Sequence, residues 1–166
     1  MRILLAIDGS PCSKVAVEEV RRRPWPEGSE VRLLTVRSPI EAMLLQEASH
    51  LPMPGELIFK QSGWREVDFM NDALARLESS VAGLRVTPIL LEGRAKDVIL
   101  DDAEQWGADL IVVGSHGYGI VRHFLLGSVS LAVALNAPCS VEIVRSRDDR
   151  PRGDVPVTAT GGGEPG

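Results

Sequence analysis

The residues whose types and spacing could do chemistry are glycines and serines on either side of one loop in the second half of the chain. Gly114-Ser115-His116-Gly117 follows the apolar run 110–113, and Gly127-Ser128-Val129-Ser130 precedes the apolar run 131–135. A buried strand that ends in glycine opens onto a loop that ligands can reach, and Gly114 and Gly117 would let a ligand approach the backbone. The second stretch is typical of a helix start, where unpaired amides and hydroxyls favour an anion. Together they predict a phosphate-binding site.

The intervals between these residues form a pattern: Gly114, two residues, Gly117, nine residues, Gly127 and then Ser128. This pattern resembles the nucleotide signature of the universal stress protein family, in which it marks members that bind ATP. The resemblance extends from residue 1 to about residue 144, and the predicted domain is 1–145. A structural alternative stays open, in which the glycines serve only tight turns and a helix cap.

Two earlier positions join the predicted site because of where their strands end. Asp8 ends the first apolar run at the edge where open α/β sheets bind ligands, so its carboxylate could accept from a ribose or adenine, or coordinate a metal. An ordinary turn aspartate is the alternative, since Gly9 follows it. Val36 ends the second strand, and the resemblance implies that its backbone meets the adenine edge. Core packing is the alternative for Val36.

The resemblance places the nucleoside on Asp8 and Val36 and the phosphates on the helix start, with Val113 and Val129 on either side. It implies that His116 supports the loop, while Arg122 is the best candidate for a charge partner of the triphosphate. The predicted nucleotide-binding residues are Asp8, Gly9, Ser10, Val36, Val113, Gly114, His116, Gly117, Arg122, Gly127, Ser128, Val129 and Ser130.

Little or no hydrolysis is expected from this site. The chain has no Gly-x-x-x-x-Gly-Lys-[Ser/Thr] motif, and neither a positioned general base nor a committed arginine finger can be identified. The adjacency of Ser115 and His116 does not establish a hydrolytic triad. Because the pocket lacks an obvious lysine, Mg²⁺ or Mn²⁺ is expected to neutralise part of the triphosphate charge.

The leading hypothesis is therefore an ATP-binding stress-response module in which the nucleotide sets the conformation. Two alternatives remain: a nucleotide-independent dimeric interaction protein, and a slow ATPase. The sequence does not name the stress, the protein partner or the preferred nucleotide.

Strand and helix patterns alternate along the chain and must position these residues. Apolar runs predict strands at 2–8, 30–37, 84–91, 110–113 and 139–144. Residues spaced by three and four predict helices between them, with Ser10 as a cap, Pro11 as a first helical residue and Gly107 as a helix end. The alternation predicts a doubly wound, five-stranded parallel sheet with helices on both faces. The resemblance implies an adenine nucleotide alpha hydrolase-like fold, with the flavodoxin-like strand order 3-2-1-4-5.

Composition limits the partners. The chain has 166 residues, of which 44% are hydrophobic, which suits one domain. A net charge of -5 argues against general nucleic-acid binding. No segment reads as a membrane span or a signal peptide, so we expect a cytoplasmic protein with no membrane partner. The two cysteines belong to no ligand cluster, and we expect neither a metal nor a redox role for them.

The last strand, 139–144, is expected at a sheet edge, where an apolar strand invites pairing. Family members commonly dimerise through this edge, so the resemblance implies a homodimer through Cys139 to Val144. Residues 146–166 lose all periodicity and predict a disordered tail. The segment from Ser38 to Trp64 is the least readable, and could be a lid or a partner surface.

Overall fold

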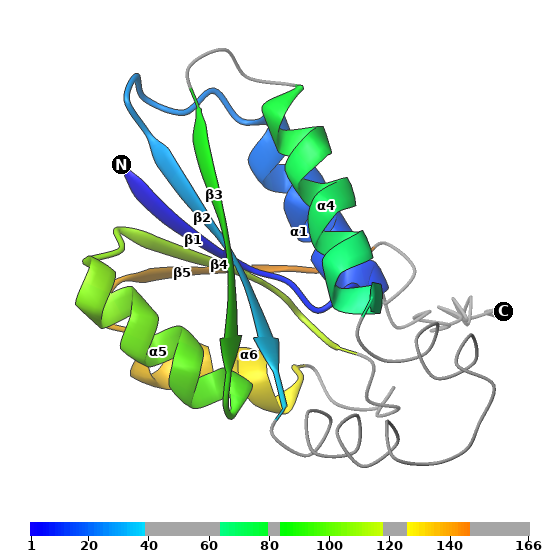
Figure 1. Ribbon diagram of the computed structural model, residues 1–166. Helices are drawn as coiled ribbons and strands as arrows, with labels where there is room; N and C mark the ends of the chain where they lie inside the picture. The colour runs from blue at the N-terminus through cyan, green and yellow to red at the C-terminus, as the bar shows by residue number, and fades with distance from the viewer. Residues whose placement is uncertain (39–63, 80–83, 118–125, 147–166) are drawn as a thin grey trace, which may run out of the picture.

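Five strands form a single parallel sheet. The computed structural model describes residues 1–38, 64–79, 84–117 and 126–146. The elements are β1 (Arg2–Ala6), α1 (Pro11–Arg22), β2 (Glu30–Arg37), α4 (Trp64–Glu78), β3 (Arg85–Glu92), α5 (Ala95–Trp106), β4 (Leu110–Gly114), α6 (Ser128–Asn136) and β5 (Ser140–Val144) (Figure 1). All four strand pairings are parallel, and the order is β3-β2-β1-β4-β5. The predicted fold class and strand order are confirmed.

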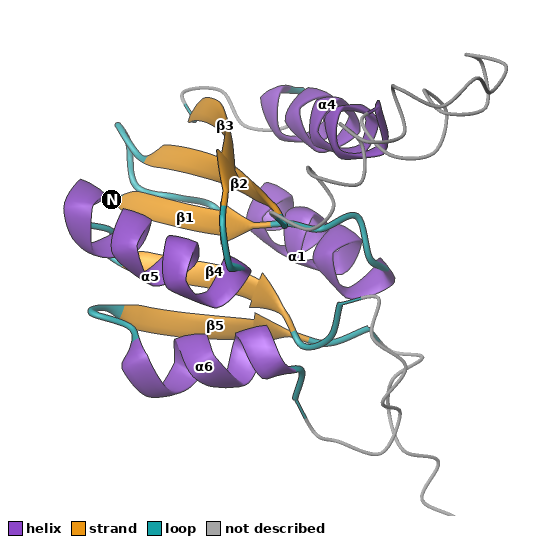
Figure 2. Ribbon diagram, turned by 60° about the horizontal axis from the view of Figure 1, so that its bottom comes forward, coloured by secondary structure: helices purple, strands orange, loops and turns teal. Residues whose placement is uncertain are grey.

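The sheet lies between two pairs of helices, with α1 and α4 on one face and α5 and α6 on the other (Figure 2). Because β1 is central, both of its faces are buried, and its sequence is apolar without interruption from Ile3 to Ala6. Ile3 and Leu5 pack in the core on the α1 and α4 side, while Leu4 packs in the core on the α5 and α6 side. This packing fixes the positions of the helices on the two faces of the sheet.

Local signals in the sequence set several helix ends. Ser10 caps α1, its side chain accepts from the Ser13 amide, and Pro11 is the first helical residue. The helix ends at Arg22, before the two prolines at 24 and 26. Gly107 ends α5 in the left-handed conformation, with φ of 69°. These cap positions agree with the sequence prediction.

β1 ends at Ala6, two residues before the predicted end at Asp8. The backbone still bonds to β2 once more, from the Ile7 amide to the Leu34 carbonyl oxygen over 2.9 Å. The chain then turns, because the Asp8 carboxylate accepts from the Ser10 amide over 2.9 Å and Gly9 adopts φ of 79°. Asp8 is therefore a turn residue that lies just beyond the strand.

Among the described residues, one ion pair connects α1 to α4 on the first face, and a second lies within α1. The Glu18 carboxylate accepts from Arg21 of its own helix over 2.7 Å and lies 3.4 Å from the Arg76 guanidinium of α4. The hydrogen bond from Arg21 is the main cause that holds the pKa of Glu18 below its ordinary value. Both pairs are partly exposed, so apolar packing contributes most of the attachment between the two helices.

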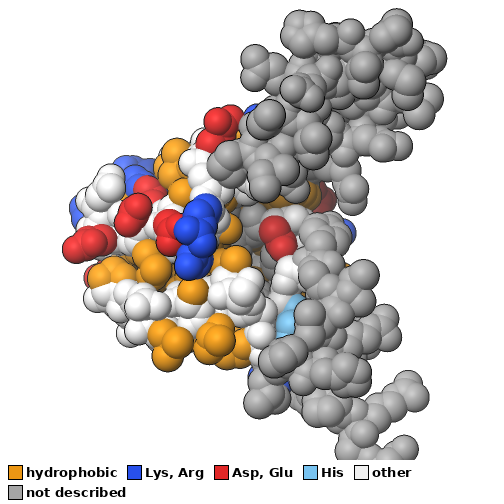
Figure 3. Space-filling model, turned by 90° about the horizontal axis from the view of Figure 1, so that it is seen from below, with side chains coloured by type: hydrophobic (Ala, Val, Ile, Leu, Met, Phe, Trp, Pro, Cys, Tyr) orange, Lys and Arg blue, Asp and Glu red, His pale blue; other side chains and the backbone are white. Residues whose placement is uncertain are grey.

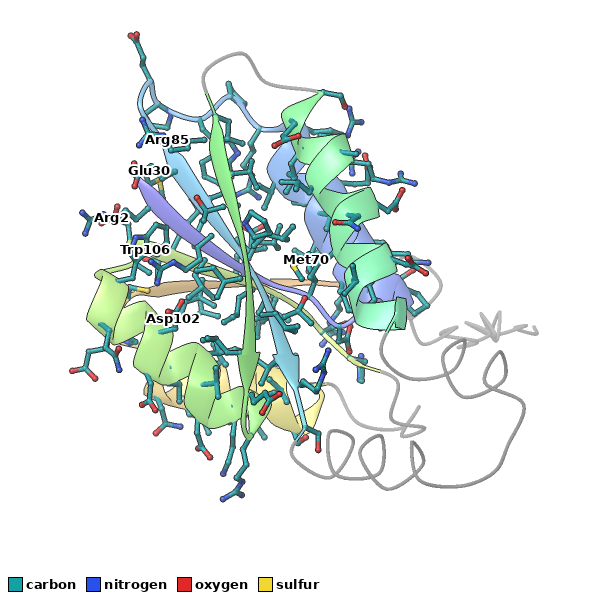
Figure 4. All side chains as sticks on the ribbon, viewed as in Figure 1. Arg2, Glu30, Met70, Arg85, Asp102 and Trp106 are labelled. Atoms are coloured by element: carbon teal, nitrogen blue, oxygen red, sulfur yellow. The ribbon has the colours of Figure 1, made fainter. Side chains whose placement is uncertain are left out.

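A network of charged and aromatic side chains fastens the end of α5 to the amino edge of the sheet. Arg32 of β2 donates to Asp102 over 2.7 Å, and its guanidinium carbon lies 4.4 Å from the centre of the Trp106 ring. Arg2 donates to the Trp106 carbonyl oxygen over 2.8 Å. Figure 4 shows Arg2, Asp102 and Trp106 together at this edge. With its last turn held here, α5 begins at the opposite, carboxyl edge.

Candidate functional site

A cavity of about 560 Å³ opens at the carboxyl edge of the sheet, beyond the ends of β1 and β4. These neighbouring strands lead into helices on opposite faces, α1 and α6, which makes this point the switch point of the sheet. The volume lies within the range of small-molecule sites. The lining residues are Ala6, Ile7, Asp8, Ser10, Ser13, Leu34, Val36, Ala95, Ile99, Val113, Gly114, His116, Gly117, Leu126, Gly127, Ser128, Val129, Ser130 and Leu131.

The cavity gathers most of the residues that the sequence singled out, from both halves of the chain. Those that line it are Asp8, Ser10, Val36, Val113, Gly114, His116, Gly117, Gly127, Ser128, Val129 and Ser130. Gly9 lies beside the cavity without lining it, and Arg122 falls outside the described residues. Whether these residues contact a nucleotide stays a prediction.

The first turn of α6 presents amides for which the described residues provide no acceptor. Gly127 caps the helix without a side-chain hydrogen bond, and the first intrahelical bond runs from the Leu131 amide to the Gly127 carbonyl oxygen over 2.9 Å. The amides of Ser128, Val129 and Ser130 come before that bond, and all three residues line the cavity. Such amides attract an anion at the positive end of the helix dipole.

One carbonyl group holds the two halves of the glycine loop together. The Ser115 carbonyl oxygen accepts from the Gly127 amide over 2.8 Å and from the Ser130 hydroxyl over 2.8 Å. The Ser130 hydroxyl also lies 3.0 Å from the Gly127 carbonyl oxygen, and the residue is 3% exposed. The Ser130 proton is thus committed to the backbone, so Ser128 is the residue of this turn whose hydroxyl can donate to a ligand.

The start of α1 meets the same cavity but has fewer amides to offer an anion. The Ser10 hydroxyl oxygen accepts from the Ser13 amide over 3.3 Å, and Pro11 has no amide proton to offer. Ser10 also donates to the His116 carbonyl oxygen over 3.2 Å, which connects the two loops across the cavity. Because α1 is capped and α6 is open, the geometry directs an anion toward α6.

The comparisons with known proteins agree with this architecture. The model of the universal stress protein family matches residues 1–145. The chain belongs to the universal stress protein family. A universal stress protein of Thermus aquaticus, from the 3′ region of the QAH/OAS sulfhydrylase gene, is 32% identical to this member over 143 residues, with 86% of this chain and 97% of the relative covered.

Solved structures show the same fold. The structure of hypothetical protein MJ0577 matches this universal stress protein with a TM-score of 0.72 and 26% identity, over 89% of this chain and 96% of that one. A universal stress protein in complex with cAMP has a TM-score of 0.59 and 23% identity, over 87% and 96%. A family member from Arabidopsis thaliana with AMP bound has a TM-score of 0.63 and 18% identity, over 92% and 97%. The predicted adenine nucleotide alpha hydrolase-like fold is confirmed.

In this universal stress protein the glycines of the signature do not adopt left-handed backbone conformations; among the described glycines only Gly9, Gly28, Gly93 and Gly107 have positive φ. Position 114 has no room for a side chain. A Cβ there would lie 2.9 Å from the carbonyl carbon of Cys12 and 2.9 Å from the Ser13 amide nitrogen, so only glycine fits without a shift of the backbone. A Cβ on Gly117 would lie 2.6 Å from Asp8 Oδ2. Close packing against the backbone of α1 is therefore the structural reason for glycine at position 114.

Gly9 has a structural reason of its own. Its φ of 79° is unfavourable for other residues, and a Cβ at this position would lie 2.7 Å from the Phe69 ring of α4. Gly9 therefore lets α4 pack against the turn that places Asp8 at the cavity. Asp8 itself is exposed, with one oxygen bound by the Ser10 amide and the other next to Gly117.

Sequence reasoning missed the apolar wall of the cavity. Ala95 and Ile99 of α5 line it from one side, and Leu34 of β2, Leu126 and Leu131 complete it. A signal existed, because α5 begins directly after β3 and parallel strands end at one edge, so its first turn had to lie there. In the sequence these positions carry only the periodicity of an ordinary core helix.

Neither a membrane span nor a metal cluster is found in the part of the chain that the structure describes. None of the helices there is long and apolar enough to cross a bilayer. The same ranges hold no group of three or more His, Cys, Asp or Glu side chains that could bind a metal ion. The described residues that line the cavity also include neither lysine nor arginine. Because these residues carry no positively charged side chain, the positive electrostatic potential that they create in the cavity comes from backbone amides.

Proposed function

We propose that this universal stress protein binds ATP in the cavity, as a nucleotide-dependent stress-response module. The observation that carries the proposal is the first turn of α6, whose amides have no acceptor among the described residues and whose residues line a cavity with apolar side chains on the opposite side. This arrangement offers an anion site and a site for a flat apolar base within one space. Support also comes from structures of the same fold that contain cAMP and AMP.

The nucleotide lies across the ends of the central strands. Asp8 and the backbone of Val36 bind the nucleoside, with Val113 and Val129 on either side of it. Gly114 and Gly117 leave room, and the phosphates lie beside Gly127 on the amides of Ser128, Val129 and Ser130. Gly9, Ser10 and His116 belong to the same site, as does Arg122 as a charge partner from outside the described residues. The binding domain spans residues 1–145 and acts in the cytoplasm.

Mg²⁺ or Mn²⁺ accompanies the triphosphate. The described residues provide Asp8 as the carboxylate at the cavity and Ser128 as a hydroxyl, which is too few ligands for a protein cage. Such a set suits Mg²⁺, which keeps several waters and is held chiefly by phosphate oxygens. The cation supplies charge neutralisation, and the protein orients the nucleotide.

Little hydrolysis is proposed, because the polar groups of Ser115 are used for structure. Ser115 is fully buried, and its backbone amide donates to the Val144 carbonyl oxygen over 2.7 Å. A nucleophile at this position could not reach a substrate in the cavity. The bound nucleotide therefore sets the conformation of the loop, and the alternative of a slow ATPase would require turnover that survives purification.

Binding is tested by titration calorimetry with ATP, AMP and cAMP, each with and without Mg²⁺. We expect saturable binding of ATP that Mg²⁺ strengthens, and a melting temperature that rises with ligand concentration. Asp8→Ala is expected to weaken binding of all three nucleotides, because each contains the nucleoside. If none of the three binds to the folded protein, the nucleotide-independent interaction protein becomes the better assignment.

We also propose a homodimer through β5, within the predicted stretch Cys139 to Val144. β5 is an edge strand, and the adjacent helix α6 exposes Leu131 to 46% and Leu135 to 75%. Figure 3 shows apolar side chains gathered on the face formed by α5 and α6. Exposed strand edges beside apolar surface favour pairing with another chain.

The dimer is tested by sedimentation equilibrium of the full chain. We expect a dimer for the native protein, and a weaker dimer for Leu135→Glu, which adds charge to an exposed position without loss of core packing. Lys14→Glu, on the opposite side of the sheet, is the matched control and should leave the dimer intact. A native protein that sediments as a monomer at every concentration would contradict the proposal.

A further inference from the structure

The edge strand β5 carries one charged side chain, and a cation from the end of α1 binds it. Glu142 is the central residue of the five-residue strand, and its neighbours in the strand are uncharged. It faces the side of the sheet that α1 covers, as Val144 does, because residues two apart in a strand share a face. An unpaired carboxylate at this position would discourage another strand from pairing with this edge.

Arg23, which follows the last residue of α1, binds both oxygens of that carboxylate. Its Nη1 and Nη2 groups donate to Glu142 over 2.6 and 2.5 Å, and Nη2 also donates to Glu19 over 3.2 Å. The guanidinium carbon lies 5.5 Å from the centre of the Trp25 ring, a second contact that orients the group. A guanidinium has five N–H donors, so these three bonds leave two donors that the described residues do not use.

A second copy that pairs with β5 must bring its own Glu142 to the same place. Two identical chains that meet through the same strand are related by a two-fold axis. Such an axis is compatible with an antiparallel ladder, in which opposite residues exchange bonds reciprocally, but not with the offset bonds of a parallel ladder. Full overlap of the two strands then places Glu142 opposite Glu142 of the second copy, with their Cβ atoms about 5 Å apart.

Resting on the proposed homodimer, we propose that Arg23 is the residue that allows the β5 edge to pair with a second copy of this chain. Each guanidinium neutralises the Glu142 carboxylate of its own chain, and its remaining N–H groups donate to the Glu142 carboxylate of the other chain. Two cations and two carboxylates then alternate around the two-fold axis, where two carboxylates alone would repel each other. The pair thereby converts an unfavourable charge on the edge strand into a contact between the two copies.

The pairing is tested by sedimentation equilibrium of the full chain with Arg23→Met, which keeps a long apolar side chain and removes the charge. The dissociation constant of the dimer should rise roughly tenfold to a hundredfold, because both Glu142 carboxylates of the dimer lose their partners. Arg22→Met is the matched control: the ion pair of Arg22 is with Glu19 over 3.6 Å, so its loss should leave the dimer intact. A dimer that is equally tight in the native protein and in Arg23→Met would overturn the inference.

Glu142→Gln in the Arg23→Met background separates the effect of charge from that of packing. The second substitution removes the repulsion between the two carboxylates, so it should restore most of the affinity that Arg23→Met loses. A double variant that dimerises as weakly as Arg23→Met alone would mean that the guanidinium acts only by its bulk, and would overturn the charge pairing.

Arg23→Lys provides a second variant in case Arg23→Met does not fold. Lysine keeps the positive charge but not the planar fork with its spare donors, so the dimer should weaken several-fold, whereas Arg22→Lys should not weaken it. If the native chain is a monomer at every concentration, the proposed homodimer and this inference fail together. A native dimer that Leu135→Glu weakens, and that neither substitution of Arg23 affects, would overturn this inference alone.

Discussion

Ser128→Pro is expected to weaken ATP binding roughly tenfold to a hundredfold, because it removes one amide that donates to a charged phosphate. The substitution suits the backbone: Ser128 is the first residue of α6, a position that proline favours, and Pro11 already occupies the equivalent position of α1. The preceding residue, Gly127, has the extended conformation that proline requires, with ψ of 162°. Binding would thus fall without loss of the fold.

Ser128→Val is the matched control for this experiment. Valine also removes the hydroxyl and adds similar bulk, but it keeps the backbone amide. Titration calorimetry should therefore show a much smaller loss for Ser128→Val than for Ser128→Pro, while thermal unfolding shows similar stability for both variants. Equal affinity in the two variants would mean that the amide does not bind phosphate, and the proposed orientation of the nucleotide would have to be abandoned.

Gly114→Ala is expected to lower the free energy of unfolding by about 3 kcal/mol, the upper part of the range for overpacked cores. The new Cβ would collide with the backbone of α1, at 2.9 Å from both the Cys12 carbonyl carbon and the Ser13 amide nitrogen. A backbone contact of this kind is relieved only if the helix moves from the sheet. The corresponding fall in melting temperature is roughly 6 to 12 °C for a chain of this size.

Gly28→Ala separates this collision from the general cost of replacing glycine. Gly28 has φ of 75°, but no atom lies within 4 Å of the Cβ position. Its replacement should therefore cost only the left-handed conformation, about 1 to 2 kcal/mol. Urea unfolding of both variants measures the difference, and a loss in Gly114→Ala no larger than that in Gly28→Ala would contradict the packing role.

The parts of the fold that depend on local signals could be predicted from the sequence. Ser10 before Pro11 predicted the start of α1, and Gly107 predicted the end of α5, because capping is decided by residues within one turn. The glycine spacing predicted the loop, and alternating strands and helices predicted the sheet. The physical reason for Gly114 was not predictable, since its neighbour in space is a helix about one hundred residues earlier in the chain.

Much of the candidate site could also be placed from the sequence, whereas its supporting contacts could not. Ser115 was passed over because nothing next to it in the sequence shows that it is buried or that its partners include Cys12 and Val144. Ala95 and Ile99 read as ordinary helix residues for the same reason. Such contacts join residues far apart in the chain, and a single sequence contains no local record of them.

The anion site formed by the amides of Ser128, Val129 and Ser130 at the start of α6 limits how binding to the protein can be regulated. Backbone amides cannot be acetylated, methylated or titrated in the physiological range, so the attraction exerted by the amides of residues 128–130 is constant. A cell could not turn this part of the site off by modifying a lysine, as it could in a site built on basic side chains. The fraction of the protein with nucleotide bound would then depend on the nucleotide concentration alone, so occupancy of this site would report that concentration.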